Sequence, residues 1–392
     1  MAVEWEKTSL REAGVTLIDC DHRTPPAAEV GYPYIAIPQV KQGRIDLSDV
    51  RLISPEHFKD WTRKAKPQHY DVVLSRRCNP GETAHVPEGL DCALGQNLVL
   101  LRADGTKLFP PFLRWLVRGP NWWEQVGTFI NVGAVFDSLK CADIPNFRLP
   151  VPPLAEQRAI AGVLGALDDK IELNRQMNET LEAMAQTLFK NRFVDAATKL
   201  PKGWREGTLG EVTENPRRGI QPDEIKSATP YIGLEHMPRR CIALSDWGHA
   251  DELESNKFEF ERGEILFGKL RPYFHKVGVA PVDGVCSTDI LVVRPKTPEW
   301  FGFVLGHVSS VELVNHTNAA STGTKMPRAN WNDIARFEVA LPPDSLAAEF
   351  TATIRPMIDR IIANIHESRT LAELRDALLP KLLSGELRVP IK

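Results

Sequence analysis

The sequence lacks the features of membrane and secreted proteins. Its 392 residues contain no hydrophobic run approaching the roughly 20 apolar residues that a membrane-spanning helix needs, and the N-terminus has no apolar core of a signal peptide. The six cysteines are scattered singly, without a CxxC pair or paired histidines, so neither zinc nor disulfides are expected. We therefore expect a cytoplasmic protein with reduced thiols.

Signatures of catalysis are also missing. There is no GxxxxGK[ST] phosphate loop, no GxGxxG turn after a strand and no Gly-x-Ser-x-Gly elbow. Asn79-Pro80-Gly81 matches only the first two residues of the Asn-Pro-Pro-aromatic motif of adenine methyltransferases. We therefore expect a recognition protein, with no catalytic residue, metal site or cofactor site in this chain.

An excess of positive charge is the third missing feature. The formal net charge is −3; residues 1–150 contain 18 basic and 18 acidic side chains, and residues 201–343 contain 17 and 19. Domains that bind nucleic acid on their own are commonly basic. If this chain binds DNA, its cations must be gathered on one face, or a partner must supply part of the phosphate contact.

What the sequence does contain is an internal repeat. Phe147 and Pro152-Pro153 recur 190 positions later as Phe337 and Pro342-Pro343. Between such anchors the two halves differ almost completely, as expected for one scaffold with two specificities. The pattern predicts two similar bodies related by a pseudo-two-fold axis, suited to a two-part target such as duplex DNA; a decayed duplication without functional division is the alternative. Further matched pairs are Trp5–Leu10 with Trp204–Leu209, Pro33–Ile35 with Pro230–Ile232, Asp71–Leu74 with Glu264–Phe267, and Leu98–Arg102 with Ile290–Arg294.

Each body is predicted to be mixed α/β. Short β-branched runs separated by Gly/Pro turns indicate strands, and Phe112–Val117 and Trp300–Val308 indicate matching helices. Trp122 and Trp123 are predicted core anchors. The expected strands of the first body are Tyr34–Val40, Val72–Ser75, Leu98–Leu101 and Asn146–Val151.

A long helix is predicted after each Pro-Pro pair. Apolar residues alternate at spacings of four and three, which is typical of a coiled-coil seam, and about 36 residues at ~1.5 Å each span roughly 54 Å. Asn174 and Asn364 occupy equivalent seam positions, where they either fix the register or face solvent. Pro356 is predicted to kink the second helix or delay its start. The seam residues are Ile160, Leu164, Leu167, Ile171, Asn174, Asn178, Leu181, Ala185 and Leu188, then Phe350, Ile354, Met357, Ile361, Asn364, Ser368, Leu371, Arg375 and Leu378.

Two loops in each body are candidate DNA contacts. One follows the strand at Val72–Ser75, or its counterpart at Ile265–Phe267, and places two cations beside turn-forming residues. The other is rich in glycine, hydroxyls or cations. An ordinary solvated loop is the alternative interpretation of each cluster. The candidates are Arg76, Arg77, Asn79 and Gly133 in the first body, and Lys269, Arg271, Tyr273, Thr322, Thr324, Lys325 and Arg328 in the second.

Three segments resemble conserved regions of specificity subunits from type I restriction–modification systems. They are Leu149–Ile160, which contains Pro152-Pro153-Leu154-Ala155-Glu156-Gln157, the opening Leu200–Leu209, and the terminal Leu378–Leu387. The second repeat departs from the pattern, because Gln157 has no glutamine counterpart after Pro342-Pro343.

The resemblance implies α/β (α+β) target-recognition domains in two pseudo-two-fold-related copies, separated by two long antiparallel coiled-coil-like helices. The implied segments are recognition domains at 1–150 and 200–343, a first spacer helix at 151–199, and a second spacer helix with the tail at 344–392. Each domain would read one half of a bipartite, asymmetric site on double-stranded DNA. The helices, Gln157 included, would set the spacing and dock two modification subunits.

The resemblance also implies what the partners supply. The modification subunits would bind S-adenosylmethionine and methylate adenine, and restriction subunits would use ATP and Mg to cleave unmethylated DNA. Two alternatives remain: an orphan specificity subunit that serves a solitary methyltransferase or another defence system, and a protein-binding scaffold without nucleic acid.

Overall fold

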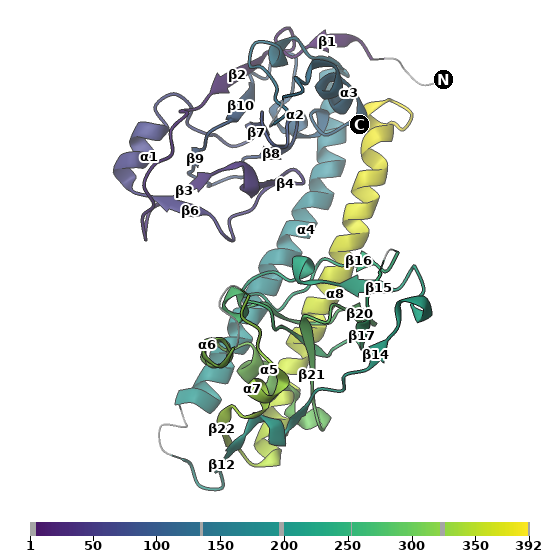
Figure 1. Cartoon of the computed structure of the whole chain (residues 1–392). Helices are drawn as coiled ribbons and strands as arrows, with labels where there is room; N and C mark the ends of the chain where they lie inside the picture. The colour runs from purple at the N-terminus through teal and green to yellow at the C-terminus, as the bar shows by residue number, and fades with distance from the viewer. Residues whose placement is uncertain (1–4, 134–135, 196–199, 252, 322–325, 391–392) are drawn as a thin grey trace. The chain divides into compact units, whose positions relative to one another are not determined.

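The computed structural model describes residues 5–133, 136–195, 200–251, 253–321 and 326–390 (Figure 1). The chain divides into two compact units, which we call unit 1 (Met1–Asp168 with Ala372–Lys392) and unit 2 (Asp169–Leu371). Two long helices pass between them: α4 (Leu154–Phe189) leaves unit 1 after Asp168, and α8 (Asp344–Leu383) leaves unit 2 after Leu371. Each unit therefore contains a part of both helices.

Unit 1 is built around a four-stranded antiparallel sheet of order β2-β10-β7-β8. Beside it are a three-stranded sheet, β6-β3-β9, the pair β1-β11 and the hairpin β4-β5. Its strands are β1 (Lys7–Ser9), β2 (Val15–Asp19), β3 (Tyr32–Ile35), β4 (Val40–Lys41), β5 (Arg44–Ile45), β6 (Arg51–Ile53), β7 (Val72–Ser75), β8 (Thr83–His85), β9 (Ala93–Leu94), β10 (Leu98–Ala103) and β11 (Arg148–Pro150), and its shorter helices are α1 (Pro55–Trp61), α2 (Pro110–Leu116) and α3 (Pro120–Phe129).

Unit 2 contains a matching four-stranded sheet of order β13-β21-β18-β19. A five-stranded sheet, β14-β17-β20-β15-β16, and the pair β12-β22 complete its β structure. Its strands are β12 (Arg205–Thr208), β13 (Thr213–Glu214), β14 (Gly219–Ile220), β15 (Pro230–Ile232), β16 (Gly248–His249), β17 (Lys257–Phe260), β18 (Ile265–Gly268), β19 (Val277–Val279), β20 (Gly284–Cys286), β21 (Ile290–Pro295) and β22 (Glu338–Leu341), and its shorter helices are α5 (Phe301–Val308), α6 (Val311–Ala320) and α7 (Trp331–Ala335).

The sheets confirm the correspondence that the repeat predicts. Strand β7 lies between β10 and β8, just as β18 lies between β21 and β19. The parallel pair β3·β9, with Ile35 beside Leu94, has its counterpart in β15·β20, with Ile232 beside Cys286. Both units are therefore mixed α/β bodies of the same plan, as expected from the sequence.

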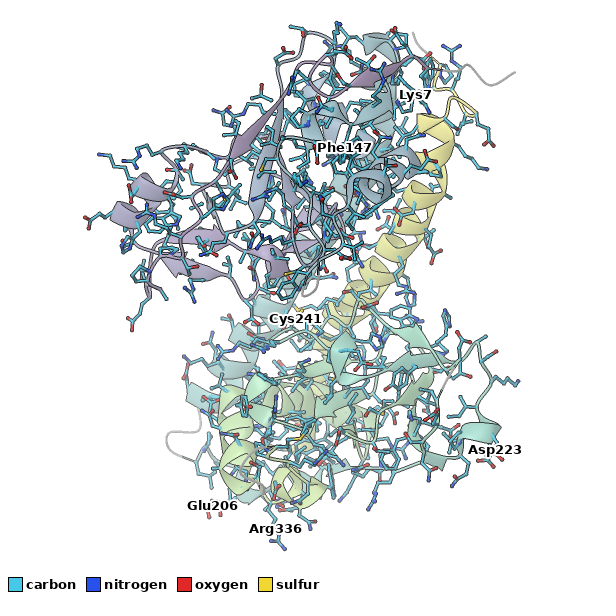
Figure 2. All side chains as sticks on the ribbon, turned by 45° about the horizontal axis from the view of Figure 1, so that its top comes forward. Lys7, Phe147, Glu206, Asp223, Cys241 and Arg336 are labelled. Atoms are coloured by element: carbon cyan, nitrogen blue, oxygen red, sulfur yellow. The ribbon has the colours of Figure 1, made fainter. Side chains whose placement is uncertain are left out.

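The core of unit 1 includes residues from both long helices. Ile160 and Leu164 of α4 and Leu382 of α8 pack in one cluster with α2 and the central sheet. Phe147, labelled in Figure 2, is fully buried there.

Only one of the two neighbouring tryptophans of α3 lies in this core. Trp122 is fully buried and donates from Nε1 to the Gly81 carbonyl at 2.8 Å, whereas Trp123 is 42% exposed. The prediction for Trp123 is wrong because successive residues of a helix point in directions about 100° apart.

The buried row of the long helices follows a longer period than predicted. On α4, Phe189 is buried and Leu188 is 38% exposed, and on α8, Ile358 is buried whereas Met357 is half-buried. Leu188 is therefore wrong as a seam position. A strict heptad repeat advances 3.5 residues per turn, but a straight helix advances about 3.6, so the two patterns separate by about 0.1 residue per turn and differ by about one residue towards the end of a helix of about ten turns.

Helix α8 begins at Asp344, directly after Pro342-Pro343. Pro356 lies inside this helix on its exposed side, so the predicted delay of the helix start is wrong. An exposed position suits proline in a helix, because the backbone carbonyl that loses its donor can be hydrated.

Candidate nucleic-acid interface

In unit 1 the two predicted loops lie next to each other. The first, residues 76–81, follows β7 and is termed the exit loop; the second, described at residues 131–133 and 136–139, is termed the return loop. The Leu139 N–H donates to the Arg76 carbonyl at 2.9 Å, and an isolated antiparallel bridge joins Arg77 to Ser138. Two segments about 60 residues apart in sequence therefore form one surface.

Unit 2 brings its two predicted loops together by the same bonds. Its exit loop is residues 269–276, and the described end of its return loop is residues 326–329. The Ala329 N–H donates to the Lys269 carbonyl at 2.9 Å, and an isolated bridge joins Leu270 to Arg328. The Arg271 N–H adds a bond of 2.7 Å to the Pro327 carbonyl.

The third residue of each exit loop has a left-handed backbone. Cys78 has φ 65° in unit 1, and Arg271, in the equivalent place, has φ 51° in unit 2. Such a conformation costs a residue with a Cβ on the order of 1 kcal/mol and is concentrated at functional sites. Because the side chains differ and the backbone agrees, the turn itself is the shared feature of the two loops.

In unit 1 the candidate side chains differ in exposure. Arg77 and Asn79 are exposed and Gly133 is exposed at the return loop. Arg76 is half-buried and donates from Nη1 to the Leu139 carbonyl at 3.3 Å. Arg76 therefore helps to hold the two loops together, and Arg77 and Asn79 are the side chains presented to solvent.

In unit 2 Tyr273 is half exposed, whereas Lys269 and Arg271 are half-buried. Arg328 is exposed and forms an ion pair with Asp289, from Nε to Oδ1 at 3.0 Å. Asp289 could not be selected from the sequence, because a lone acidic residue in a turn has no recognisable motif. Thr322, Thr324 and Lys325 lie outside the described residues.

Gln157 holds the start of α4 to the rest of unit 1. Its Oε1 accepts the Phe109 N–H at 2.7 Å, and its Nε2 donates to the carbonyls of Lys107 and Pro152 at 2.9 and 2.7 Å. The side chain is fully buried. These bonds place the motif glutamine in an internal role at the N-terminus of α2, rather than on the surface where a partner subunit would meet it.

Unit 2 achieves the same attachment with a different residue. Thr351 lies in α8. Its hydroxyl accepts the Gly302 N–H at 2.9 Å and donates to the Glu299 carbonyl at 2.6 Å. Gly302 lies in the first turn of α5, the counterpart of α2. The missing glutamine of the second repeat is therefore replaced by a threonine that the motif comparison did not identify.

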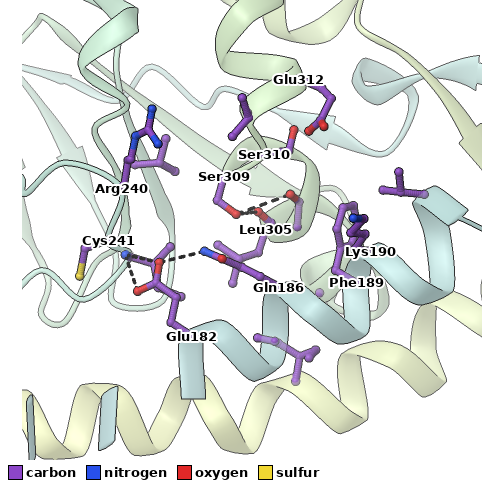
Figure 3. Close-up of a pocket in the computed structure, with 18 of the residues that line it drawn as sticks. Glu182, Gln186, Phe189, Lys190, Arg240, Cys241, Leu305, Ser309, Ser310 and Glu312 are labelled. Carbon is purple, nitrogen blue, oxygen red and sulfur yellow. Dashed lines mark hydrogen bonds between the residues drawn. The ribbon is translucent and has the colours of Figure 1, made fainter. Parts of the chain in front are cut away.

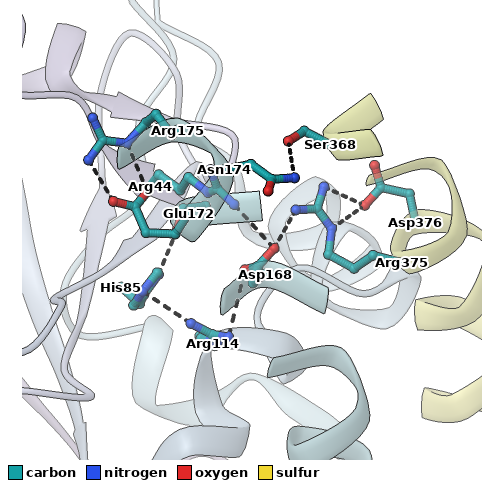
Figure 4. A network of polar contacts seen from close by, with 11 residues as sticks. Arg44, His85, Arg114, Asp168, Glu172, Asn174, Arg175, Ser368, Arg375 and Asp376 are labelled. Carbon is teal, nitrogen blue, oxygen red and sulfur yellow. Dashed lines mark hydrogen bonds and ion pairs between the residues drawn. The ribbon is translucent and has the colours of Figure 1, made fainter. Parts of the chain in front are cut away.

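A buried ion cluster fixes α8 to α4 in unit 1 (Figure 4). Asp168 accepts a hydrogen bond from Arg375 at 2.6 Å, with Arg44 at 3.5 Å and Arg114 at 3.7 Å from its oxygens. Burial opposes ionisation of Asp168, but Arg375 and the other guanidiniums hold its pKa below the ordinary value. Asp168 is buried at the turn of α4 where the seam was predicted to contain Leu167, which is only half-buried.

Burial and the nearby Arg114 lower the pKa of His85 to about 4, so this imidazole is neutral at pH 7. Its Nε2 lies 3.1 Å from Arg114 Nη1, and its Nδ1 lies 3.0 Å from the Gly43 carbonyl. A neutral ring that donates through Nδ1 and accepts through Nε2 satisfies both contacts.

The seam asparagines are buried in unit 2. Asn174 donates to Glu367 at 2.9 Å and to Ser368 at 3.2 Å, and Asn364 donates to Asn178 at 2.8 Å. The partner number on α8 falls as the number on α4 rises, so the helices are antiparallel within this unit. The structure excludes the alternative that these asparagines face solvent, and supports a role in register.

A cavity of about 350 Å³ lies beside α4 in unit 2 (Figure 3). At its wall Glu182 accepts the Ile242 N–H with both carboxylate oxygens, each at 3.1 Å. Burial raises the pKa of Glu182 to about 7 despite these bonds. The carboxyl thus ties the segment after Arg240 to the helix.

One group of potential metal ligands occurs among the described residues. The ligand atoms of Asp19, Cys20 and His22 lie within 4.8 Å of one another. The Cys20 thiol donates to the Gly95 carbonyl, and burial raises its pKa to about 11. A thiol that stays protonated is a poor ligand, so this geometry does not favour a metal centre.

Among the described helices, none combines the length and the apolar character needed to cross a bilayer.

Comparison with known proteins gives consistent matches. Residues 18–183 match the family model of the type I restriction modification DNA specificity domain. The MjaIX specificity subunit of a type I restriction enzyme from Methanocaldococcus jannaschii is 29% identical over 287 residues, which cover 66% of this chain and 65% of that protein. A second protein of that archaeon, provisionally named the type I restriction enzyme MjaX specificity subunit, is 30% identical over 389 residues, covering 92% of this chain and 88% of that protein.

A crystal structure agrees at the level of the fold. The S subunit of a type I restriction-modification system from M. genitalium has a TM-score of 0.56 and 16% identity, covering 97% of this chain and 96% of that one.

Proposed function

This chain belongs to the family of type I restriction–modification specificity subunits, and we propose that each of its two units reads one half of a bipartite, asymmetric DNA sequence. The relatives are named specificity subunits, and this chain, like them, is a recognition component rather than an enzyme. The proposal places its work in the cytoplasm, on double-stranded DNA.

The observation that carries the proposal is that the same backbone hydrogen bond joins the two loops in each unit. Leu139 bonds to Arg76 as Ala329 bonds to Lys269, at the same 2.9 Å, while the side chains around the joint differ. A shared backbone with different side chains is what two readers of different sequences require. The cations of the exit loops, two in unit 1 and three in unit 2, supply groups that bind phosphates or guanine edges.

The exposed side chains suggest different readouts. Unit 1 presents Arg77 and Asn79, a pair that can contact guanine and adenine edges in the major groove. Unit 2 presents Tyr273, and Lys269 and Arg271 of the same loop are half-buried. The near-neutral net charge agrees with a subunit that binds DNA inside a larger complex, where partners supply further phosphate contacts.

We further propose that α4 and α8 set the spacing of the half-sites and dock two modification subunits. Those subunits would bind S-adenosylmethionine and methylate adenine in each half-site. Restriction subunits that use ATP and Mg would then cleave unmethylated DNA. The exposed faces of the helices are the surfaces available for docking, because Gln157 is used inside unit 1.

The test is co-expression with a candidate modification (methyltransferase) subunit, followed by methylation-sensitive long-read sequencing of the host genome. We expect a split motif with adenine methylated in both halves, abolished when this chain is deleted. Methylation without cleavage activity would identify a partner of a solitary methyltransferase. A folded protein with no modified motif would contradict the proposal and favour a protein-binding scaffold.

Variants of the exit loops test the division of labour. Arg77→Ala is expected to change the selectivity at one half-site and Lys269→Ala the affinity for the other. If both substitutions act on the same half-site, the assignment of one half-site to each unit is wrong.

A further inference from the structure

A third segment of unit 2 lies against its exit loop. Residues 238–241 form a turn after the short helix at Leu234–His236, and the Arg240 N–H donates to the His275 carbonyl at 2.8 Å. The Arg239 guanidinium lies 4.2 Å from the centre of the Phe274 ring. The turn, the exit loop and the described end of the return loop therefore meet on one surface, although they are far apart in sequence.

This surface is strongly cationic in a chain whose net charge is −3. Residues 234–241, 269–276 and 326–328 contain six arginines and lysines and one carboxylate, Glu235. Asp289 approaches from outside these segments to pair with Arg328. The cations are Arg239, Arg240, Lys269, Arg271, Lys276 and Arg328.

The backbone of the surface is held in an unfavourable conformation. Arg240, Arg271 and His275 have φ of 52°, 51° and 51°, values that favour glycine. Strain of this kind persists only where neighbouring bonds impose it, and it is concentrated at functional sites. Here the Arg240–His275 bond links two of the strained residues directly.

Hydrogen bonds to α4 and β19 also hold the turn in place. Ile242, two residues after Arg240, donates to Glu182 of α4 and accepts the Val279 N–H at 3.0 Å. The position of the Arg240 backbone is thus fixed by a long helix and by the central sheet, while its side chain is exposed. A rigid backbone with an exposed guanidinium is suited to a phosphate at a fixed place.

We infer that the 238–241 turn is a third DNA-binding loop of unit 2, with Arg240 bound to a backbone phosphate of its half-site. The inference rests on the proposed function. A phosphate contact positions the unit on the duplex without reading sequence. Loss of Arg240 should therefore weaken binding to every duplex by a similar factor and leave the preferred sequence unchanged.

The experiment measures binding of the complex with its modification subunits to a fluorescent duplex that carries the methylated motif's sequence, over a series of salt concentrations. Arg240→Gly is the main variant, because glycine suits the left-handed backbone and the substitution should not disturb folding. Arg240→Lys keeps the charge. Arg262→Ala is the control, since this exposed cation lies at the opposite end of strand β18 from the exit loop.

We expect Arg240→Gly to weaken binding severalfold and to lower the slope of log Kd against log salt by about one. Arg240→Lys should retain the slope, and Arg262→Ala should match the wild type. If Arg240→Gly binds the duplex as tightly as Arg262→Ala does while Arg271→Ala binds more weakly, the assignment of the 238–241 turn as a DNA-binding loop is wrong and the proposed function stands. If the unsubstituted complex does not prefer its motif over other duplexes, both fail.

Discussion

Replacing Glu182 with glutamine is expected to stabilise unit 2 at alkaline pH and to do much less at acidic pH. The carboxyl is 7% exposed and its pKa is raised to about 7, mainly by burial. A glutamine can still accept the Ile242 N–H and carries no charge. The substitution therefore removes the cost of ionisation while keeping the contact that anchors the 238–241 turn.

The size of the effect follows from proton linkage. Because the pKa is raised in the folded state, the stabilising contribution of the protonated carboxyl is complete below a pH of about 4.5 and is lost as the pH rises through about 7. At roughly 1.4 kcal/mol per pH unit, the complete loss is about 3 kcal/mol. About 2 kcal/mol of it should fall between pH 5.5 and pH 8, since the unfolded carboxyl is already largely ionised at pH 5.5.

The measurement is urea unfolding of the full chain at pH 5.5 and pH 8. The two units need not unfold together, so a brief hydrogen-exchange pulse at one common pH should identify the peptides of unit 2 that have unfolded. Glu312→Gln, which removes an exposed carboxylate from the same cavity, is the matched control. An advantage of Glu182→Gln that is equal at both pH values would refute the reasoning.

Four further substitutions test the internal bonds of the units. Asp168→Asn should destabilise unit 1 by about 3 kcal/mol in urea unfolding, because Arg375 loses its buried carboxylate partner and keeps only the exposed Asp376; an unchanged midpoint would contradict this. Gln157→Leu and Thr351→Val should each cost about 1–3 kcal/mol by leaving a buried N–H without an acceptor, and equal hydrogen-exchange protection of the Phe109 and Gly302 amides in variant and parent would argue against it. Asn364→Leu should be destabilising because it leaves the buried Asn178 Oδ1 without its donor. Recovery of stability in the double variant with Asn178→Leu is the check.

The sequence predicted the central elements of each unit well. Strand β7 has the predicted bounds, Val72–Ser75, and the matched strand β18 begins one residue after the anchor Glu264. These segments are short, buried and rich in branched residues, so local pattern and tertiary structure agree. The repeat added information that a single segment does not contain, because residues that recur in both copies mark the positions that the shared fold requires.

The side-chain connections were much less predictable. The bond from Leu139 to Arg76 and the approach of Arg240 to His275 join segments that are distant in sequence, and backbone hydrogen bonds leave no residue signature. Thr351 could be found only from the structure, because it performs the role of Gln157 at a different position and with a shorter side chain. Asp168 and Glu182 were missed because a strict heptad assigned their places to neighbouring leucines.

The repeat and the folding unit do not have the same boundary, which leads to a prediction about fragments. Residues 1–199 contain the whole first repeat, but the core of unit 1 also includes Leu379, Leu382 and Leu383 of α8, which are 7%, 1% and 4% exposed. The packing is tight, since a Cβ on Gly119 would lie 2.3 Å from Leu383 Cδ1. At about 1.5–3 kcal/mol for each buried leucine, their loss removes on the order of 5–9 kcal/mol.

A loss of that size is comparable with the whole stability of a typical domain. A fragment of residues 1–199 should therefore not unfold cooperatively as a monomer, and a synthetic peptide of residues 372–392 should restore the transition in circular dichroism. A peptide in which Leu382 is replaced by aspartate is the control. Cooperative unfolding of the monomeric fragment alone, unchanged by the peptide, would mean that α8 is an accessory to unit 1 and not part of its core.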